Sequence, residues 1–280
     1  MPLNENAALA VRLYKELLRT NEWSIEDAWK AIAKLFLTCG VYERGWSVLF
    51  DGIVFAERNI FNESKSQTQN SAMRAGSEIA DLLAKELKVT RQALCSEIGL
   101  YWQEPLVSNK QPHNLIGHAF RSVIAETLRV FGAKGLDVSE EEDPYKLFAG
   151  FGFTSRSKNP RIDIVVKKNA KPVALISTRW RFRHDRVDLI DESRSYLTAA
   201  RSVNSNCKFY AVIGEFAASR INKVVEHTPE RVSRGAPIEA CVHFAPQLTE
   251  PANRKAKEKE SLSLVKDLVW LTKESVTWHG

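Results

Sequence analysis

The sequence has few of the features that mark membrane, secreted or zinc-binding proteins. Its four cysteines lie far apart and form no CxxC pair, which argues against a zinc site and a disulfide framework and fits a reducing cytosol. No window approaches eighteen uninterrupted apolar residues, so we expect no membrane span. The first residues, MPLNENAALAVRLYKE, show no basic stretch followed by an apolar run, so we expect no signal peptide. Together these absences predict a cytoplasmic protein.

Motifs for nucleotide and zinc chemistry are missing as well. The sequence has no GxxxxGK[ST] motif, so ATP-driven activity is not expected. Gly150, Phe151 and Gly152 form a GxG, but no strand–loop–helix pattern surrounds it, and we expect no nucleotide cofactor. The six histidines show no metal-ligand spacing, which argues against catalytic zinc.

What is present is a modest positive charge that concentrates in one segment. The 280 residues carry a net charge of +6, and the eight residues from Arg179 to Arg186 read RWRFRHDR, with four arginines. Such arginines typically bind phosphates and guanine edges. A solvated charged face is the alternative, but the run directly follows an apolar strand pattern, which favours a nucleic-acid partner. Trp180 and Phe182, which alternate with the arginines, are expected to pack beneath the segment.

The chain divides into a helical first part and a mixed second part. Apolar residues at three- and four-residue spacing predict helices within residues 5–105, and Ser24 with Asp27 resembles a capping box at the start of one helix. A polar, proline-containing connector follows over 103–113. Asn114 then predicts the N-cap of an amphipathic helix that ends at Gly132. We therefore expect a helical N-terminal region, 1–105, and a second domain, 106–280.

Beyond this helix the apolar period changes to that of strands. Residues 135–160 look irregular and exposed. The elements predicted after them are a strand over Arg161–Lys167, a turn over Asn169–Lys171, a strand over Val173–Arg179, a helix over Val187–Ser202, strands over Cys207–Gly214 and Ala240–Ala245, and a final helix over Leu262–Thr272. This order predicts an α/β fold with a mixed β-sheet core flanked by helices.

Four residues in this second part suggest phosphodiester chemistry. Metal-dependent hydrolysis of a phosphodiester needs carboxylates that hold a divalent cation and a positive side chain that stabilises the transition state. Asp163 lies in the first strand of the predicted hairpin. Ser177 and Arg179 end the second strand, two residues apart and therefore on one face. Glu192 follows on the next predicted helix.

In this order the residues resemble the permuted active site of type II restriction endonucleases of the PD-(D/E)xK superfamily that read CCGG, CCNGG or CCWGG. There a Ser or Thr replaces the middle acid, and a Glu from the downstream helix takes its metal-binding role. The resemblance, over residues 112–245, implies a restriction-endonuclease-like fold and Mg²⁺-dependent cleavage of double-stranded DNA at a CC/GG core, with CCGG as the expected form. Asp163 and Glu192 would bind the Mg²⁺, Arg179 would stabilise the phosphorane, and Ser177 would position its strand.

The resemblance also assigns the arginine-rich segment to DNA. Readers of CCGG carry a pattern R-x-D-R on the recognition helix, and this chain has Arg183, His184, Asp185 and Arg186 at that spacing. Arg183 and Arg186 would bind guanine N7 and O6, and Asp185 would accept from cytosine N4. Arg181 and His184 are further candidates for contact with DNA.

The near-palindromic targets of this group imply a homodimer, with a tetramer as the alternative, in a prokaryotic cytoplasm. The N-terminal helices would then serve dimer formation or clamping of the DNA. Neither a membrane nor a nucleotide cofactor is expected.

The sequence departs from the family's pattern at two positions and leaves alternatives for Glu126 and for the function. The family has lysine where this chain has Arg179, and it has proline directly before the first Asp, whereas Pro160 lies three residues before Asp163. Glu126 has two interpretations: a helix-borne acid that orders a metal-bound water, or a surface ion pair with Arg129. The alternative functions are a structure-specific or repair nuclease, and a DNA-binding protein on a nuclease scaffold that has lost catalysis.

Overall fold

A computed structural model describes residues 11, 14–16, 18–28, 84–85, 90, 92–93, 112–153, 159–180, 188–215, 218–244, 246 and 260–280. Its centre is a five-stranded sheet in which the strands follow one another in chain order. The first three strands are antiparallel, and the last three are parallel. The strands are β1 (Leu136–Glu142), β2 (Ile162–Lys168), β3 (Lys171–Arg179), β4 (Lys208–Ile213) and β5 (Ala240–His243). The predicted mixed sheet is therefore confirmed.

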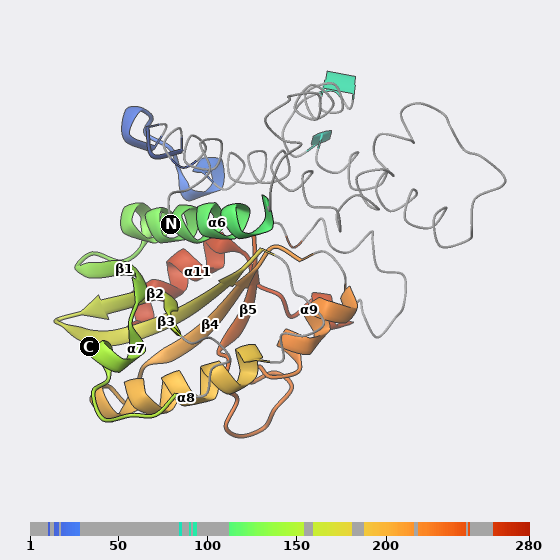
Figure 1. The fold of residues 1–280 in the computed structure, drawn as a ribbon. Coiled ribbons are helices and arrows are strands. Elements are labelled where there is room, and N and C mark those ends of the chain that lie inside the picture. Colours follow the sequence, from blue (N-terminus) through green and yellow to red (C-terminus); the bar gives the residue numbers. More distant parts are fainter. Residues whose placement is uncertain are drawn as a thin grey trace.

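Helices cover both faces of this sheet (Figure 1). One face carries α6 (Pro112–Phe131) and α11 (Leu268–Glu274), and the other carries α8 (Asp188–Val203) and α9 (Ala218–Val225). Two shorter helices, α7 (Pro144–Leu147) and η3 (Ser275–Thr277), lie at the margins. Among the described residues, no helix combines the length and the apolar character needed to cross a membrane.

A tight turn joins β2 to β3. Lys168 pairs with Lys171, and the two residues between them, Asn169 and Ala170, have φ angles of 51° and 63°. Two positive φ angles in succession are the mark of a type I′ turn, whose twist matches that of the flanking strands. The turn sets the pairing next to it, and a register shift between Val166 and Lys167 then moves the pairing by one residue, so that Ile164 faces Ile176. The turn and this shift together bring the polar end of β2 beside the polar end of β3.

Strand β1 corrects the expectation that 135–160 is irregular. It pairs along its length with β2, at the edge of the sheet. Glu140 on this strand accepts hydrogen bonds from Ser122 Oγ (2.8 Å), Arg129 Nη2 (3.2 Å) and Arg121 Nε (3.3 Å) of α6. Burial acts to raise the pKa of Glu140, but these donors outweigh burial and hold the pKa below its usual value. Acidic residues thus form a strand here because the arginines of α6 lie above them.

Two helix boundaries also differ from prediction. Helix α6 begins at Pro112, so Asn114 lies inside the helix and is not its N-cap, because proline already suits the first turn. The helix ends as expected, with Gly132 N donating to Leu128 O at 2.9 Å. The predicted final helix is interrupted at Lys266, which bridges to β5, and Asp267 then caps α11 by accepting from Trp270 N at 2.7 Å.

The N-terminal region is described only in part. Residues 14–16, 18–20 and 25–28 are helical, and Tyr14 Oη lies 2.8 Å from Thr127 Oγ1 of α6. Ser24 and Asp27 form reciprocal hydrogen bonds, Asp27 N to Ser24 Oγ at 3.1 Å and Ser24 N to Asp27 Oδ2 at 3.3 Å, so the expected capping arrangement is confirmed. The division at residue 105 remains a prediction.

Candidate active site

The β2–β3 hairpin brings Asp163 beside Ser177. Since Ile164 pairs with Ile176 in the antiparallel register, Asp163 stands opposite Ser177. Arg179, two residues further along β3, emerges on the same face. That face is covered by α8, whose residue Glu192 lies in its first half. Four residues from three elements therefore meet at one end of the sheet.

The Asp163 carboxylate is held by three donors on one oxygen. Its Oδ2 accepts from Ser177 Oγ at 3.1 Å, from the backbone N–H of Thr178 at 2.7 Å, and from Arg179 Nη1 at 3.0 Å. The backbone donor was not predicted, because its position depends on the strand register and no side chain marks it in the sequence. This set of bonds fixes the orientation of the carboxylate.

Arg179 joins Asp163 to Glu192. Its Nη1 lies 3.0 Å from Asp163 Oδ2 and its Nη2 lies 3.2 Å from Glu192 Oε2. The three side chains are mostly buried, with exposed fractions of 21% for Arg179, 15% for Asp163 and 16% for Glu192. The guanidinium fork thus spans the space between two carboxylates, an arrangement in which each ion pair is stronger than it would be in open solvent.

The carboxylate oxygens of this site are the type of ligand that Mg²⁺ prefers. This ion is usually held by one or two carboxylates, with water and phosphate oxygens completing its coordination, and Asp163 with Glu192 would supply the two. Within the described part of the chain, no group of three or more His, Cys, Asp and Glu is close enough to hold a metal without such outside ligands. Because Arg179 lies between the carboxylates, a cation that binds both must compete with the guanidinium.

No protein-family model matches this chain, and no curated protein matches it. A function can therefore be inferred from the geometry of these residues alone.

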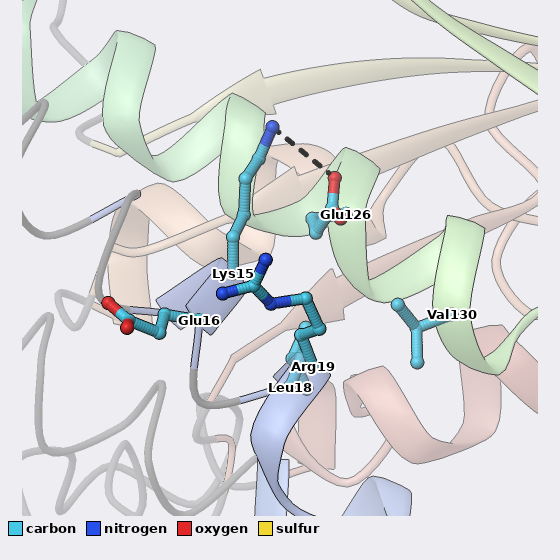
Figure 2. A pocket seen from close by; sticks show the side chains of 6 residues that line it. All are labelled: Lys15, Glu16, Leu18, Arg19, Glu126 and Val130. Carbon is cyan, nitrogen blue, oxygen red and sulfur yellow. Dashed lines mark ion pairs between the residues drawn. The ribbon is translucent and has the colours of Figure 1, made fainter.

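Glu126 is not part of this group. It lies on α6, which covers the opposite face of the sheet from α8. Its Oε2 pairs with Arg129 Nη1 at 3.1 Å and with Lys15 Nζ at 3.5 Å. Figure 2 shows Glu126 and Val130 on one side of a pocket of about 650 Å³, with Lys15 and other residues of the N-terminal segment on the other. Of the two interpretations of Glu126, the structure shows the ion pair, and we leave Glu126 out of the candidate site.

The predicted DNA-contacting residues lie outside the described residues: Arg181, Arg183, His184, Asp185 and Arg186. Their segment, 181–187, directly connects Arg179 and Trp180 to the start of α8.

Trp180 anchors the start of that segment in the core. Its ring packs 5.4 Å from that of Phe120 and 5.5 Å from that of Phe244, as expected from its position. Gly214 lies directly against this indole, where a Cβ atom would come within 2.5 Å of the ring.

Tyr196 is a neighbour of the site that the sequence did not single out. It follows Glu192 by one helical turn on α8 and is 3% exposed. Burial raises the pKa of Tyr196, and the charges of Glu192 and Asp163 raise it further. In the sequence, the four-residue spacing from Glu192 could have indicated that Tyr196 lies near the site. An aromatic residue on the apolar side of a helix is usually interpreted as part of the core, however.

Proposed function

We propose that this chain is a Mg²⁺-dependent endonuclease of the PD-(D/E)xK type, with a restriction-endonuclease-like fold, that cuts double-stranded DNA at a site with a CC/GG core. The observation that carries the proposal is the convergence of Asp163 and Glu192 on Arg179, which lies within hydrogen-bonding distance of both carboxylates. The mixed sheet, with an antiparallel hairpin leading into a parallel pair, is compatible with that fold.

The residues have separate roles in the proposed hydrolysis. Asp163 and Glu192 would hold the cation, which when bound supplies positive charge to the phosphate and acidifies water. Ser177 and the Thr178 amide would keep Asp163 oriented. Arg179 would turn from the carboxylates to the phosphate and neutralise charge on its oxygens. A water oxygen attacks phosphorus, the bond from phosphorus to the 3′ oxygen breaks, the water loses a proton to solvent, and the 3′ oxygen gains one.

The chain order supports a link between cleavage and recognition. Residues 181–187, which carry the proposed guanine-reading arginines, begin one residue after Trp180 and end where α8 begins. A contact between DNA and this segment would therefore act on both Arg179 and Glu192. Because the expected site is palindromic, the proposal includes a homodimer, or a tetramer built from two dimers, with each subunit cutting one strand.

Digestion of plasmid DNA tests the proposal directly. Purified protein with plasmid and Mg²⁺ should give discrete bands, and sequencing of their ends should reveal one short motif with a CC/GG core. Asp163→Ala should abolish cutting but retain DNA binding. Random nicking would instead favour a structure-specific or repair nuclease. Absence of cutting by a folded parent protein would refute the nuclease, and equal cutting by Asp163→Ala would refute its assigned metal ligand.

A second candidate function is a DNA-binding protein on a nuclease scaffold that no longer cuts. The observation that favours it is the position of Arg179, which bridges both carboxylates where the resembling enzymes have lysine. Arg179→Lys separates the two functions, because lysine replaces the planar guanidinium, which puts a separate nitrogen on each carboxylate, with one compact ammonium. If lysine creates cutting in a protein that binds DNA but does not cut, the second function holds for the natural chain.

A further inference from the structure

The hydroxyl of Tyr196 is buried and makes no hydrogen bond with any described residue. Buried polar side chains are almost always hydrogen-bonded, so such an exception needs an explanation. Other hydroxyls on the same helix follow the rule: Ser193 Oγ donates to Ile190 O at 2.7 Å, and Ser195 Oγ donates to Glu192 O at 3.0 Å. The Tyr196 hydroxyl thus has no hydrogen-bond partner among the described residues, whereas the neighbouring hydroxyls of the same helix each donate to a backbone carbonyl.

The geometry of α8 places this donor near Glu192. The two residues are four positions apart and share a face of the helix. Side chains on an α-helix lean toward its N-terminus, so the Tyr196 ring lies over the turn that carries Glu192. The ring of Phe153 packs against it at 5.3 Å, and Tyr145 packs against Phe153 at 5.2 Å, which fixes the ring.

Glu192 will lose its hydrogen bond from Arg179 if the proposed function is correct. Its Oε2 accepts from Arg179 Nη2. A divalent cation between Asp163 and Glu192 would repel this guanidinium, and a phosphate would attract it. Carboxylates that bind metals are normally held in turn by hydrogen bonds from neighbouring groups.

We propose that the Tyr196 hydroxyl is the positioning group that donates a hydrogen bond to the Glu192 carboxylate once Arg179 has turned away from it. This inference rests on the proposed function, because the cation and the DNA phosphate are what draw Arg179 away. The Tyr196 hydroxyl then makes no hydrogen bond to Glu192 while Arg179 bridges the carboxylates, and it donates one when Arg179 leaves.

A stability comparison without any metal tests the exchange. Tyr196→Phe in the parent chain should leave the melting temperature unchanged or slightly higher, since the hydroxyl removed has no partner. In an Arg179→Met background the same change should lower it by about 2–6 °C, because Tyr196 would there already hold Glu192. The matched control is Tyr210→Phe, whose hydroxyl accepts from Trp278 Nε1 at 2.8 Å and donates to Glu274 at 3.4 Å. This control should lower the melting temperature in both backgrounds.

The second measurement is cation binding. It is monitored through the electron paramagnetic resonance signal of free Mn²⁺. Tyr196→Phe should weaken Mn²⁺ binding by about 10–100-fold, and Tyr210→Phe should not change it. An unchanged affinity for Mn²⁺, or a loss of stability from Tyr196→Phe in the parent chain equal to that from Tyr210→Phe, overturns the inference. If the parent binds no Mn²⁺, or if its Mn²⁺ binding survives Asp163→Ala, the proposed function fails at its cation site. The inference then fails with it. If the parent binds Mn²⁺ and Tyr196→Phe binds it equally, the inference alone fails.

Discussion

Replacing Arg179 by methionine should make the protein's stability depend on a divalent cation. The substitution keeps an unbranched chain and removes the charge that bridges Asp163 and Glu192 at 3.0 and 3.2 Å. Loss of one partner from a buried ion pair costs about 3–5 kcal/mol, and exposed pairs contribute about 0–1 kcal/mol. With 15–21% of these side chains exposed, we expect a loss of about 2–3 kcal/mol, or a melting temperature lower by about 5–10 °C.

A cation that occupies the vacated position should reverse this loss. At a concentration of about one hundred times its dissociation constant, a ligand of the folded state adds about 2.7 kcal/mol of stability. The parent should gain less, because there the cation must first displace the guanidinium. The assay is thermal unfolding of both proteins without DNA, in chelator and in millimolar Mg²⁺ or Ca²⁺.

Arg220→Met is the matched control for this experiment. Arg220 Nη1 pairs with Glu215 Oε2 at 2.9 Å, and its side chain is 22% exposed, close to the value for Arg179. The Arg220→Met protein should lose stability in chelator and should not recover it with cation, since Arg220 pairs with one carboxylate among the described residues. Equal recovery of the two variants, or an Arg179→Met protein as stable as the parent in chelator, would refute the reasoning.

Three other changes should have distinct effects. Glu140→Gln should cost about 1–3 kcal/mol at pH 7. Because the folded pKa of Glu140 lies below its usual 4.5, this contribution is full above pH 4.5 and fades as the pH falls through the lowered pKa, which denaturant titrations at pH 7 and at strongly acidic pH would show. An equal cost at both pH values would exclude the charge as the cause. Glu126→Gln should change stability by less than about 1 kcal/mol and leave DNA cleavage unaffected, whereas a tenfold slower digestion would return Glu126 to the site. Gly214→Ala should destabilise by about 1–3 kcal/mol in denaturant unfolding, because its Cβ would meet the Trp180 ring, and no loss would mean that this ring moves aside freely.

Much of the sheet was predictable because its signals are local. The alternating and continuous apolar runs of β2, β3 and β4 and the period of α6 and α8 depend only on neighbours in sequence. The proximity of Asp163 and Ser177 follows from a hairpin with a short turn, although their direct pairing also depends on the register shift between Val166 and Lys167. The approach of Glu192 follows from the helix that comes next and covers the same face.

The features that were missed depend on contacts between distant segments. Strand β1 reads as a charged loop until the arginines of α6 are placed over Glu140. The break at Lys266 arises from its bridge to β5, which no helical pattern reveals. The helical period places Glu126 on the polar side of α6, but it does not say whether that side meets the hairpin or Lys15.

Arginine at position 179 changes the geometry of the site and leaves its formal charge unchanged. Asp163, Glu192 and Arg179 sum to −1, a divalent cation would bring the sum to +1, and one phosphodiester would balance it. Lysine would give the same sums. An ammonium is a compact donor, however, whereas the planar guanidinium reaches one carboxylate with each of two nitrogens, 3.0 and 3.2 Å away. Which of the two proposed functions holds therefore depends on how readily this fork releases the two carboxylates.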